Sequence, residues 1–381
     1  MAVYDNRRRT DPAPKRATES SAEFFNRIAG PFWDQIREVV NEWWSHFPDH
    51  VRPGLLGRLV DRNSDSNVHS ALWELYLHEM LIGSGCTVQI EQQVGARGKY
   101  PDFLVTHGGV QFVLEAIWTA QRVGGGEPGR TPPQLVEAID RVPSPNFFVA
   151  YQLDVAGPTT PPQRRLKAEL AKWLYGLDPD RVVAAQGQGV PLPRHVWQEA
   201  GWRITFDAIP RSPDRRGDPT ARTIGVHTSV WLDEDLNPVL GAVRRKGGKY
   251  GEMNLPFIVA VGNEAVFPED STTGAALYGT LGGRDPGRAS EGYWDISEGH
   301  PHSRVSGVLV VDNPGPWNWA RRTPVLWRSP YPESMPAPVL PIWEAASLVG
   351  AEVVRVPAER PVNSALGLPD HWPVGAPFPR S

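Results

Sequence analysis

The sequence predicts an α/β fold with a central mixed β-sheet flanked by helices. One observation behind this prediction is that segments with helical spacing of apolar residues alternate with short, strongly apolar segments. A second is that "LPFIVAVG" at 255–262 and "VSGVLVVD" at 305–312 are continuously apolar, which is typical of strands covered on both faces. With 381 residues, 40% of them hydrophobic, the chain can form one elaborated domain or two ordinary ones.

The N-terminal part of the chain predicts a flexible arm followed by helices. Residues 1 to about 20 are polar and basic. Residues 22–47 carry apolar side chains at helical spacing, with Pro31 as a break or a first-turn residue. Residues 68–85, "VHSALWELYLHEMLIGSG", form the clearest helix of the chain and are apolar nearly all round. A helix of this kind is expected to be largely buried.

Short strands and further helices follow. Residues 86–94 alternate between apolar and polar side chains, as a strand does. Residues 99–118, "KYPDFLVTHGGVQFVLEAIW", predict two apolar strands joined by a glycine turn. Beyond this hairpin we expect strands at 146–154, 202–210 and 223–231, and helices at 132–142, 161–175 and about 235–250.

Composition suggests three parts along the chain. Residues 1–66 form the arm and an N-terminal helical segment, residues 67–312 form the α/β core with a loop-rich insertion near 155–222, and residues 313–381 form a Pro/Trp-rich extension. The chain contains 39 prolines and 15 tryptophans, many of them in its last third. This composition predicts long ordered loops held by aromatic side chains.

Charge and cysteine content exclude some classes of protein. The net charge of −4 excludes a strongly basic nucleic-acid binder, although a local basic groove stays compatible with it. A single cysteine, Cys86, rules out an intramolecular disulfide and a cysteine-rich zinc site. No apolar run reaches the roughly 18 residues that cross a bilayer, and the polar start lacks the apolar stretch of a secretion signal. We therefore expect a cytoplasmic protein with no membrane partner.

Two carboxylates stand out in the hairpin segment. Asp102 opens its first strand, and Glu115 lies among apolar residues of the second. A charge buried in a sheet costs several kcal/mol unless it is paired, protonated or bound to metal. Carboxylates on adjacent strands suit Mg²⁺, which prefers oxygen ligands and assists phosphodiester hydrolysis. The alternative is that Asp102 caps a turn and Glu115 faces solvent.

The hairpin segment "PDFLV…FVLEAIW" resembles the PD-(D/E)XK nuclease superfamily, whose fold is restriction-endonuclease-like. In that family a Pro-Asp at a strand start is followed, after a turn, by Glu-X-Lys on the next strand. Here Pro101 and Asp102 match, Glu115 follows 13 residues after Asp102, and Glu74 lies on the preceding helix, which often contributes another acid. The resemblance covers roughly residues 67–155, and the order of helix, strand, Asp strand and Glu strand is that of the family.

The resemblance implies a metal-dependent endonuclease, a phosphodiester hydrolase that acts on DNA in defence, restriction or repair. It implies a restriction-endonuclease-like core within 67–312 and a Mg²⁺ or Mn²⁺ ion held by Asp102 and Glu115, with Glu74 as a third ligand. Glu74 has an alternative role, because His78 follows one turn later on the same helix face and the two residues could form a polar stripe. The oligomeric state stays open, with a homodimer among the options.

The lysine of the family motif is missing, because Ile117 occupies its position. An isoleucine side chain cannot hold a nucleophilic water or neutralise a phosphate. We expect a cationic or amide side chain from elsewhere beside the carboxylates, with Lys99, Gln121 and Lys246 as candidates in that order. The competing interpretation is a catalytically impaired protein that keeps the fold as a nucleic-acid-binding or protein-binding scaffold.

A basic helix end precedes the buried strand at 255–262. It carries Arg244, Arg245, Lys246 and Lys249, and we expect these cations to contact phosphates along a groove. The alternative is a solvated helix end, where basic residues interact favourably with the helix dipole.

Overall fold

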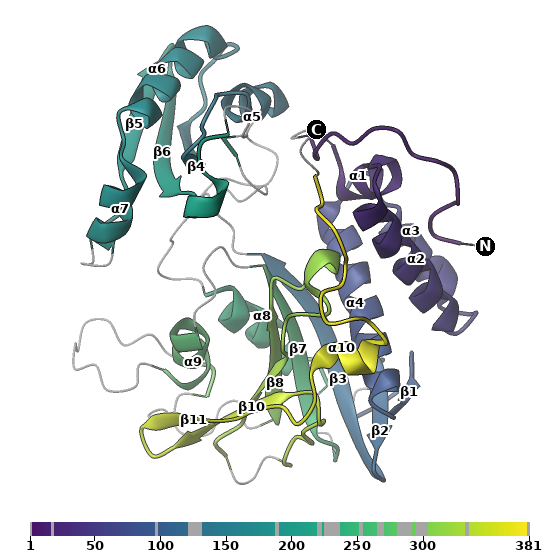
Figure 1. Ribbon diagram of the computed structural model, residues 1–381. Helices are drawn as coiled ribbons and strands as arrows, with labels where there is room; N and C mark the ends of the chain where they lie inside the picture. The colour runs from purple at the N-terminus through teal and green to yellow at the C-terminus, as the bar shows by residue number, and fades with distance from the viewer. Residues whose placement is uncertain are drawn as a thin grey trace. The chain divides into compact units, whose positions relative to one another are not determined.

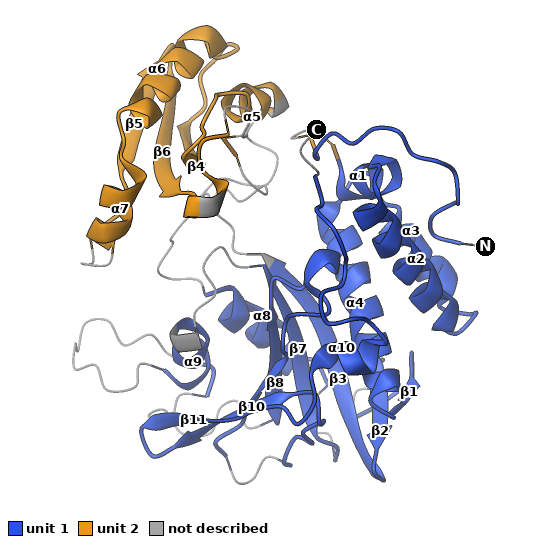
Figure 2. Ribbon diagram, viewed as in Figure 1, with its two compact units in different colours: residues 1–15, 20–120, 235–381 blue, residues 16–19, 121–234 orange. Residues whose placement is uncertain are grey.

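The structure of the protein is a computed structural model. It describes residues 2–16, 19–95, 98–120, 132–186, 190–218, 223–224, 237–250, 254–264, 270–279, 292–294, 304–331 and 335–378. Two compact units are present (Figure 2): unit 1 comprises residues 1–15, 20–120 and 235–381, and unit 2 comprises residues 16–19 and 121–234. The expected α/β class with a central mixed sheet is confirmed.

Unit 1 is built on an eight-stranded mixed sheet (Figure 1). The strand order is β1-β2-β3-β7-β8-β9-β10-β11, and β3, β7 and β8 run parallel to one another. The strands are β1 (Thr87–Gln89), β2 (Phe103–His107), β3 (Val110–Ala120), β7 (Phe257–Glu264), β8 (Gly307–Asp312), β9 (Val325–Arg328), β10 (Glu344–Val349) and β11 (Glu352–Val356). The two continuously apolar strands, β7 and β8, lie in the interior of the sheet, where both faces are covered.

The β2–β3 hairpin forms at the predicted place. Gly108 and Gly109 turn the chain with φ angles of 55° and 82°, which residues with a side chain rarely adopt. The register pairs Phe103 with Leu114. The residue before β2 therefore lies beside the residue after Leu114, and this brings Asp102 and Glu115 together.

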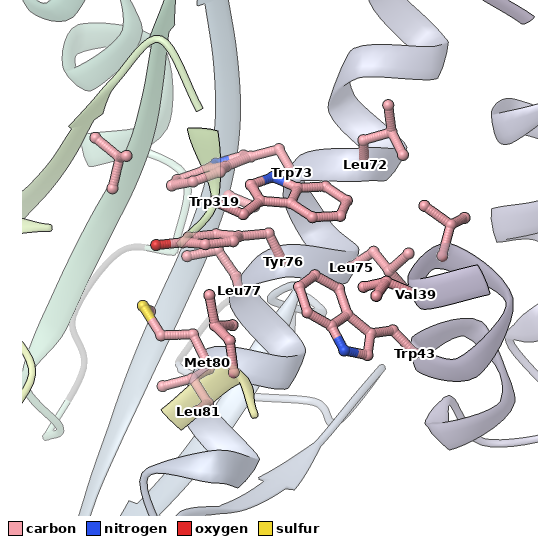
Figure 3. Packing of buried hydrophobic residues seen from close by; sticks show 14 of the residues in the cluster. Val39, Trp43, Leu72, Trp73, Leu75, Tyr76, Leu77, Met80, Leu81 and Trp319 are labelled. Atoms are coloured by element: carbon pink, nitrogen blue, oxygen red, sulfur yellow. The ribbon is translucent and has the colours of Figure 1, made fainter. Parts of the chain in front are cut away.

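Helices cover both faces of the sheet in unit 1. One face is covered by α1 (Ser21–Arg27), α2 (Pro31–His46), α3 (Arg52–Leu59), α4 (Asp65–Gly83) and α10 (Val362–Leu366), and the opposite face by α8 (Pro238–Gly247) and α9 (Asp270–Tyr278). As expected, α4 is buried nearly all round, and Figure 3 shows its Trp73, Tyr76 and Leu77 within the core. In the described part of the chain, none of the helices combines the length and apolar character needed to cross a bilayer.

The N-terminal arm differs from the expected flexible segment over residues 2–16. Tyr4 is buried, and its backbone N–H and carbonyl both pair with the Asn41 side chain of α2. Arg9 donates a hydrogen bond of 2.8 Å to the carbonyl of Asn26. The arm is therefore attached to the helices of unit 1, because a buried aromatic side chain and several polar contacts hold it there.

The C-terminal extension differs from the expected long loops. It supplies β9, β10 and β11 together with α10 and the short helix η3 (Pro316–Asn318), and its strands extend the central sheet. Trp319, Trp327 and Trp343 are at most 2% exposed, so tryptophan does seal the core as expected. A division of the chain at residue 313 is not observed, because the extension completes the sheet that the core begins.

Unit 2 contains its own three-stranded antiparallel sheet, in the order β4-β6-β5. Its elements are α5 (Pro133–Asp140), β4 (Phe147–Val155), α6 (Gln163–Tyr175), α7 (Pro179–Gln186), β5 (Arg194–Glu199), β6 (Trp202–Pro210) and η1 (Pro213–Arg215). The insertion is thus larger than the expected 155–222, because β4 pairs with β6 and not with the central sheet. The strand expected at 223–231 falls mostly outside the described residues.

Candidate functional site

Asp102 and Glu115 meet where β2 begins. The Asp102 carboxylate accepts a hydrogen bond of 2.8 Å from the backbone N–H of Ala116. The Glu115 side chain is fully buried, with 0% exposure, and its residue pairs across the sheet with Val259 of β7. The alternative of a solvent-facing Glu115 is therefore wrong. A carboxylate buried this deeply needs a partner, and the end of α8 supplies it.

Lys246 and Lys249 provide positive charge at Glu115. Lys246 lies in the last turn of α8, and Lys249 follows the helix. The Lys246 ammonium lies 2.5 Å from Oε2 of Glu115, and the Lys249 ammonium lies 2.9 Å from Oε1. Lys246 Nζ also lies 3.7 Å from Oδ2 of Asp102. The two carboxylates that the sequence singled out therefore share one ammonium group.

Burial and mutual repulsion oppose the ionisation of Glu115. Removal from water, followed by the nearby charge of Asp102, raises the pKa of Glu115 above the ordinary glutamate value, although both lysines act in the other direction. Burial alone lowers the pKa of Lys246, but the carboxylates of Asp102 and Glu115 outweigh it and leave that pKa raised. Lys246 therefore stays charged and favours the ionised form of its buried partner.

Glu74 lies on α4 and is held by Arg58 of α3. Two guanidinium nitrogens of Arg58 each lie 2.5 Å from a carboxylate oxygen of Glu74. Burial raises the pKa of Glu74, Arg58 opposes this, and the charge of Asp102 raises it further, so Glu74 belongs to the same charged neighbourhood. The expected stripe with His78 is not observed, because His78 Nδ1 lies 3.1 Å from a carboxylate oxygen of Glu79.

Arg58 is a site residue that sequence reasoning missed. Its helix, "RPGLLGRL", contains no catalytic motif and buries Leu55 and Leu59 in the core. The guanidinium group reaches Glu74 because α3 packs against α4. Packing between two helices leaves no signal in the local sequence, so no pattern in this segment could have indicated the contact.

Other predicted site residues lie elsewhere. Lys99, the first candidate for the missing lysine, belongs to an isolated backbone bridge before β2, and among the described residues it makes no ion pair with the carboxylates. Gln121 lies outside the described residues. Arg244 and Arg245 are exposed on α8 and stay outside the lysine–carboxylate cluster. Of the two candidates that the structure describes, Lys246, the last in the expected order, contacts Glu115 and Asp102.

Ile117 occupies the position where lysine was expected. Because it follows Glu115 by two residues in β3, both side chains point to the same face of the sheet. Ile117 packs against the hydrophobic cluster that contains Val261 and Val243. An apolar side chain therefore sits in an apolar environment here, and α8 delivers the ammonium groups to Glu115 from outside the hairpin.

The two carboxylates offer oxygen donors of the kind that a hard divalent cation takes. Asp102 and Glu115 already hold one cation jointly, the Lys246 ammonium, and their oxygen atoms are the donors that Mg²⁺ or Mn²⁺ takes. Within the described ranges no group of three or more His, Cys, Asp or Glu side chains is arranged to hold a metal ion. An ion here would use the two carboxylates and complete its shell with water and substrate oxygens, as Mg²⁺ commonly does.

The candidate site thus consists of the Asp102–Glu115 pair, two lysines from the end of α8, and the Arg58–Glu74 pair beside them. No protein-family model, curated protein or solved structure matches the chain.

Proposed function

We propose that the protein is a metal-dependent nuclease that hydrolyses phosphodiester bonds in DNA, with a role in defence, restriction or repair. The observation that carries the proposal is the Lys246 ammonium in contact with both Glu115 and Asp102. It gives the hairpin the cation that Ile117 does not provide. The order of α4, β1, β2 and β3, with the two acids on adjacent strands, further supports a restriction-endonuclease-like core.

Asp102 and Glu115 would hold a Mg²⁺ or Mn²⁺ ion, with Glu74 as a neighbouring acid. When bound, such an ion lowers the pKa of a coordinated water and neutralises charge that develops on a phosphate. Lys246 can donate hydrogen bonds to a water or to a phosphate oxygen once the carboxylates have another cation. Lys249, which contacts Glu115, keeps this buried carboxylate ionised and oriented.

A nucleic-acid-binding or protein-binding scaffold without catalytic activity is the second candidate, and one observation favours it. Asp102, Glu115 and Glu74 each have a hydrogen-bond or ion-pair partner within the chain. Their charges are therefore compensated without an added ion, and the pairs could serve folding alone. In such a scaffold, exposed cations such as Arg244 and Arg245 would contact nucleic acid.

Cleavage assays distinguish the two candidates. Purified protein is incubated with plasmid and single-stranded DNA in Mg²⁺ or Mn²⁺, beside Asp102→Ala and Lys246→Met. We expect the parent to cleave, and each variant to lose about a hundredfold or more in rate, because one removes a metal ligand and the other the shared ammonium. Lys172→Met removes an exposed lysine of unit 2 and should cleave as the parent does.

Two results would contradict the nuclease. One is the absence of cleavage of DNA or RNA with either metal. The other is parent-like cleavage by Asp102→Ala. Either result leaves the binding scaffold as the better account of the same geometry.

A further inference from the structure

A second polar site lies in unit 1, in a pocket of about 270 Å³. The pocket is lined by Thr273 of α9, Val310 and Asp312 of β8, Arg321, Arg322 and Thr323, and Val325 and Trp327 of β9. Asp312 is the last residue of β8. The pocket therefore lies at the carboxyl end of a parallel strand, the edge where ligands bind in open α/β sheets.

The pocket and Glu115 share one face of the sheet. In the register, Glu115 pairs with Val259, Val259 pairs with Val308, and Val308 pairs with Trp327. Residues paired directly across strands point to the same face. Three strand spacings of about 4.8 Å place Trp327 about 14 Å from Glu115. The buried core under α8 and α9 fills this span, so the distance relates the two sites within the fold and does not trace the path of a bound strand.

The rim of the pocket is positively charged. Its lining holds two guanidinium groups, both on exposed residues, and one carboxylate. The carboxylate, Asp312, accepts a hydrogen bond of 2.6 Å from Asn263. One nitrogen of Arg321 donates to the carbonyl of His371 at 2.9 Å, and Arg322 makes no ion pair with another described residue. Guanidinium groups with unused donors form bidentate hydrogen bonds with phosphate oxygens, as they do with carboxylates.

The inner surface of the pocket combines apolar and polar groups. Its floor is closed, because Val310, Trp327 and Thr273 are only 3%, 2% and 5% exposed. Val325 and Asp312 are partly exposed, and Thr323 adds an exposed hydroxyl at the rim. The Asp312 carboxylate and the Thr323 hydroxyl suit the polar edge of a nucleobase. The exposed guanidinium planes of Arg321 and Arg322 suit its ring face or its phosphate. The volume is near the lower end for ligand pockets, so it accommodates one nucleotide and not a longer segment.

We propose that this pocket binds one unpaired nucleotide of the nucleic-acid strand that the Glu115 site would cleave. A base can enter such a pocket only when it is unstacked from its neighbours. The pocket thus favours single-stranded or locally opened nucleic acid over an intact duplex. The inference rests on the proposed nuclease function for the place of the scissile phosphate, whereas binding to the pocket itself requires no metal.

Binding measured in EDTA tests the pocket without cleavage. Fluorescence anisotropy is recorded with a labelled single strand of 12 nucleotides and with the matching duplex. We expect R321A/R322A to bind the single strand about tenfold more weakly or worse. The salt dependence should flatten by about 1.4 in slope, because each phosphate contact on a single strand contributes about 0.7. R8A/R360A removes two exposed arginines outside the lining and should bind as the parent does.

A second variant keeps the charges and blocks the space. Thr323→Trp fills the pocket from its exposed rim, so it should lose the preference for the single strand while duplex affinity stays at the parent value. Circular dichroism melting checks that each variant is folded. If R321A/R322A loses the same factor for single strand and duplex, the arginines act only as surface charge and the proposal is overturned.

The remaining outcomes separate this proposal from the nuclease. Parent-like binding by R321A/R322A, or no nucleic-acid binding by the parent, overturns the nucleotide pocket even when Asp102→Ala abolishes cleavage. Conversely, pocket-dependent binding by a protein that never cleaves supports the pocket and removes the nuclease.

Discussion

Glu115 has no exposed surface, while its two cationic partners keep partial access to water. The side chains of Lys246 and Lys249 are 23% and 34% exposed. Without the lysines, the buried carboxylate would be neither hydrated nor paired. Either lysine ammonium, in contrast, could turn toward water and be hydrated there. At the scale of single residues, the lysines are therefore the members of the cluster that another cation could replace.

Removal of both lysines should destabilise the protein far more than removal of one. K246M/K249M leaves Glu115 buried without a cation, which should cost about 3 kcal/mol, whereas each single variant keeps one ammonium and should cost about 1 kcal/mol. Chemical denaturation measures the free energy of unfolding. Millimolar Mg²⁺ should restore part of the loss in the double variant, because an ion that binds only the folded state stabilises it. Equal losses in single and double variants would contradict the shared role.

The raised pKa of Glu115 gives the stability a specific dependence on pH. Because the folded protein binds a proton at Glu115 more readily than the unfolded chain, whose glutamate titrates near 4.5, the free energy of unfolding should fall as pH rises through the raised value. Burial also raises the pKa of Glu74 and Glu264, which act in the same direction. Glu115→Gln should therefore remove part of this slope in urea denaturation at several pH values. An unchanged slope would assign the dependence to the other two acids.

At the scale of elements, α8 determines which cations reach the hairpin. The Asn237 side chain caps the helix by accepting from the backbone N–H of Val239 at 2.9 Å. Val239 and Val243 face the cluster formed with β3 and β7, so the helix lies against the sheet. Its last turn then ends beside Glu115, and a helix of different length or phase would present other side chains there.

Two glycine-to-alanine variants test the close approach of α4 to α10. A Cβ at Gly83 would lie 1.7 Å from the carbonyl oxygen of Ala365, so Gly83→Ala should cost about 2 kcal/mol or more. A Cβ at Gly57 within α3 would meet nothing within 4 Å, so Gly57→Ala should stabilise by about 0.5–1 kcal/mol through helix propensity. Thermal melting of the two variants compares them directly. A parent-like melt for Gly83→Ala would contradict the contact between the two helices.

At the scale of the whole molecule, the chain forms two units with separate hydrophobic cores. The unit 2 segment interrupts the unit 1 chain between β3, which carries Glu115, and α8, which carries the lysines. The site residues therefore all belong to unit 1, although Lys246 follows Glu115 by 131 positions in the sequence.

Separate cores predict two unfolding transitions. Phe206 is fully buried in the core of unit 2. Phe206→Ala should lower the free energy of unfolding of unit 2 by about 3–5 kcal/mol and should shift only one of the two calorimetric transitions. Leu77→Ala in α4, equally buried in unit 1, should move the other. A single transition displaced by both variants would show that the units unfold as one.

Features that depend on neighbouring residues could be predicted from the amino-acid sequence alone. Glycines set the hairpin turn, continuous apolar runs gave β7 and β8, and the all-round apolar pattern of α4 indicated its burial. Asp102 and Glu115 could be singled out because a charge inside an apolar strand is costly wherever the strand lies. The strands β9 to β11 were not predicted, because they are short and lie in a part of the sequence that is rich in proline and tryptophan.

The partners of those acids depend on how distant segments pack, which the local sequence does not show. Lys99 is near Asp102 in sequence, yet Lys246 provides the contact, because α8 packs across β3 and β7 and ends at Glu115. Arg58 reaches Glu74 through the packing of α3 on α4 in the same way. Local propensities act between residues a few positions apart, whereas the meeting of distant charges follows from which faces are buried together. Which faces are buried together depends on the whole fold and not on any single segment.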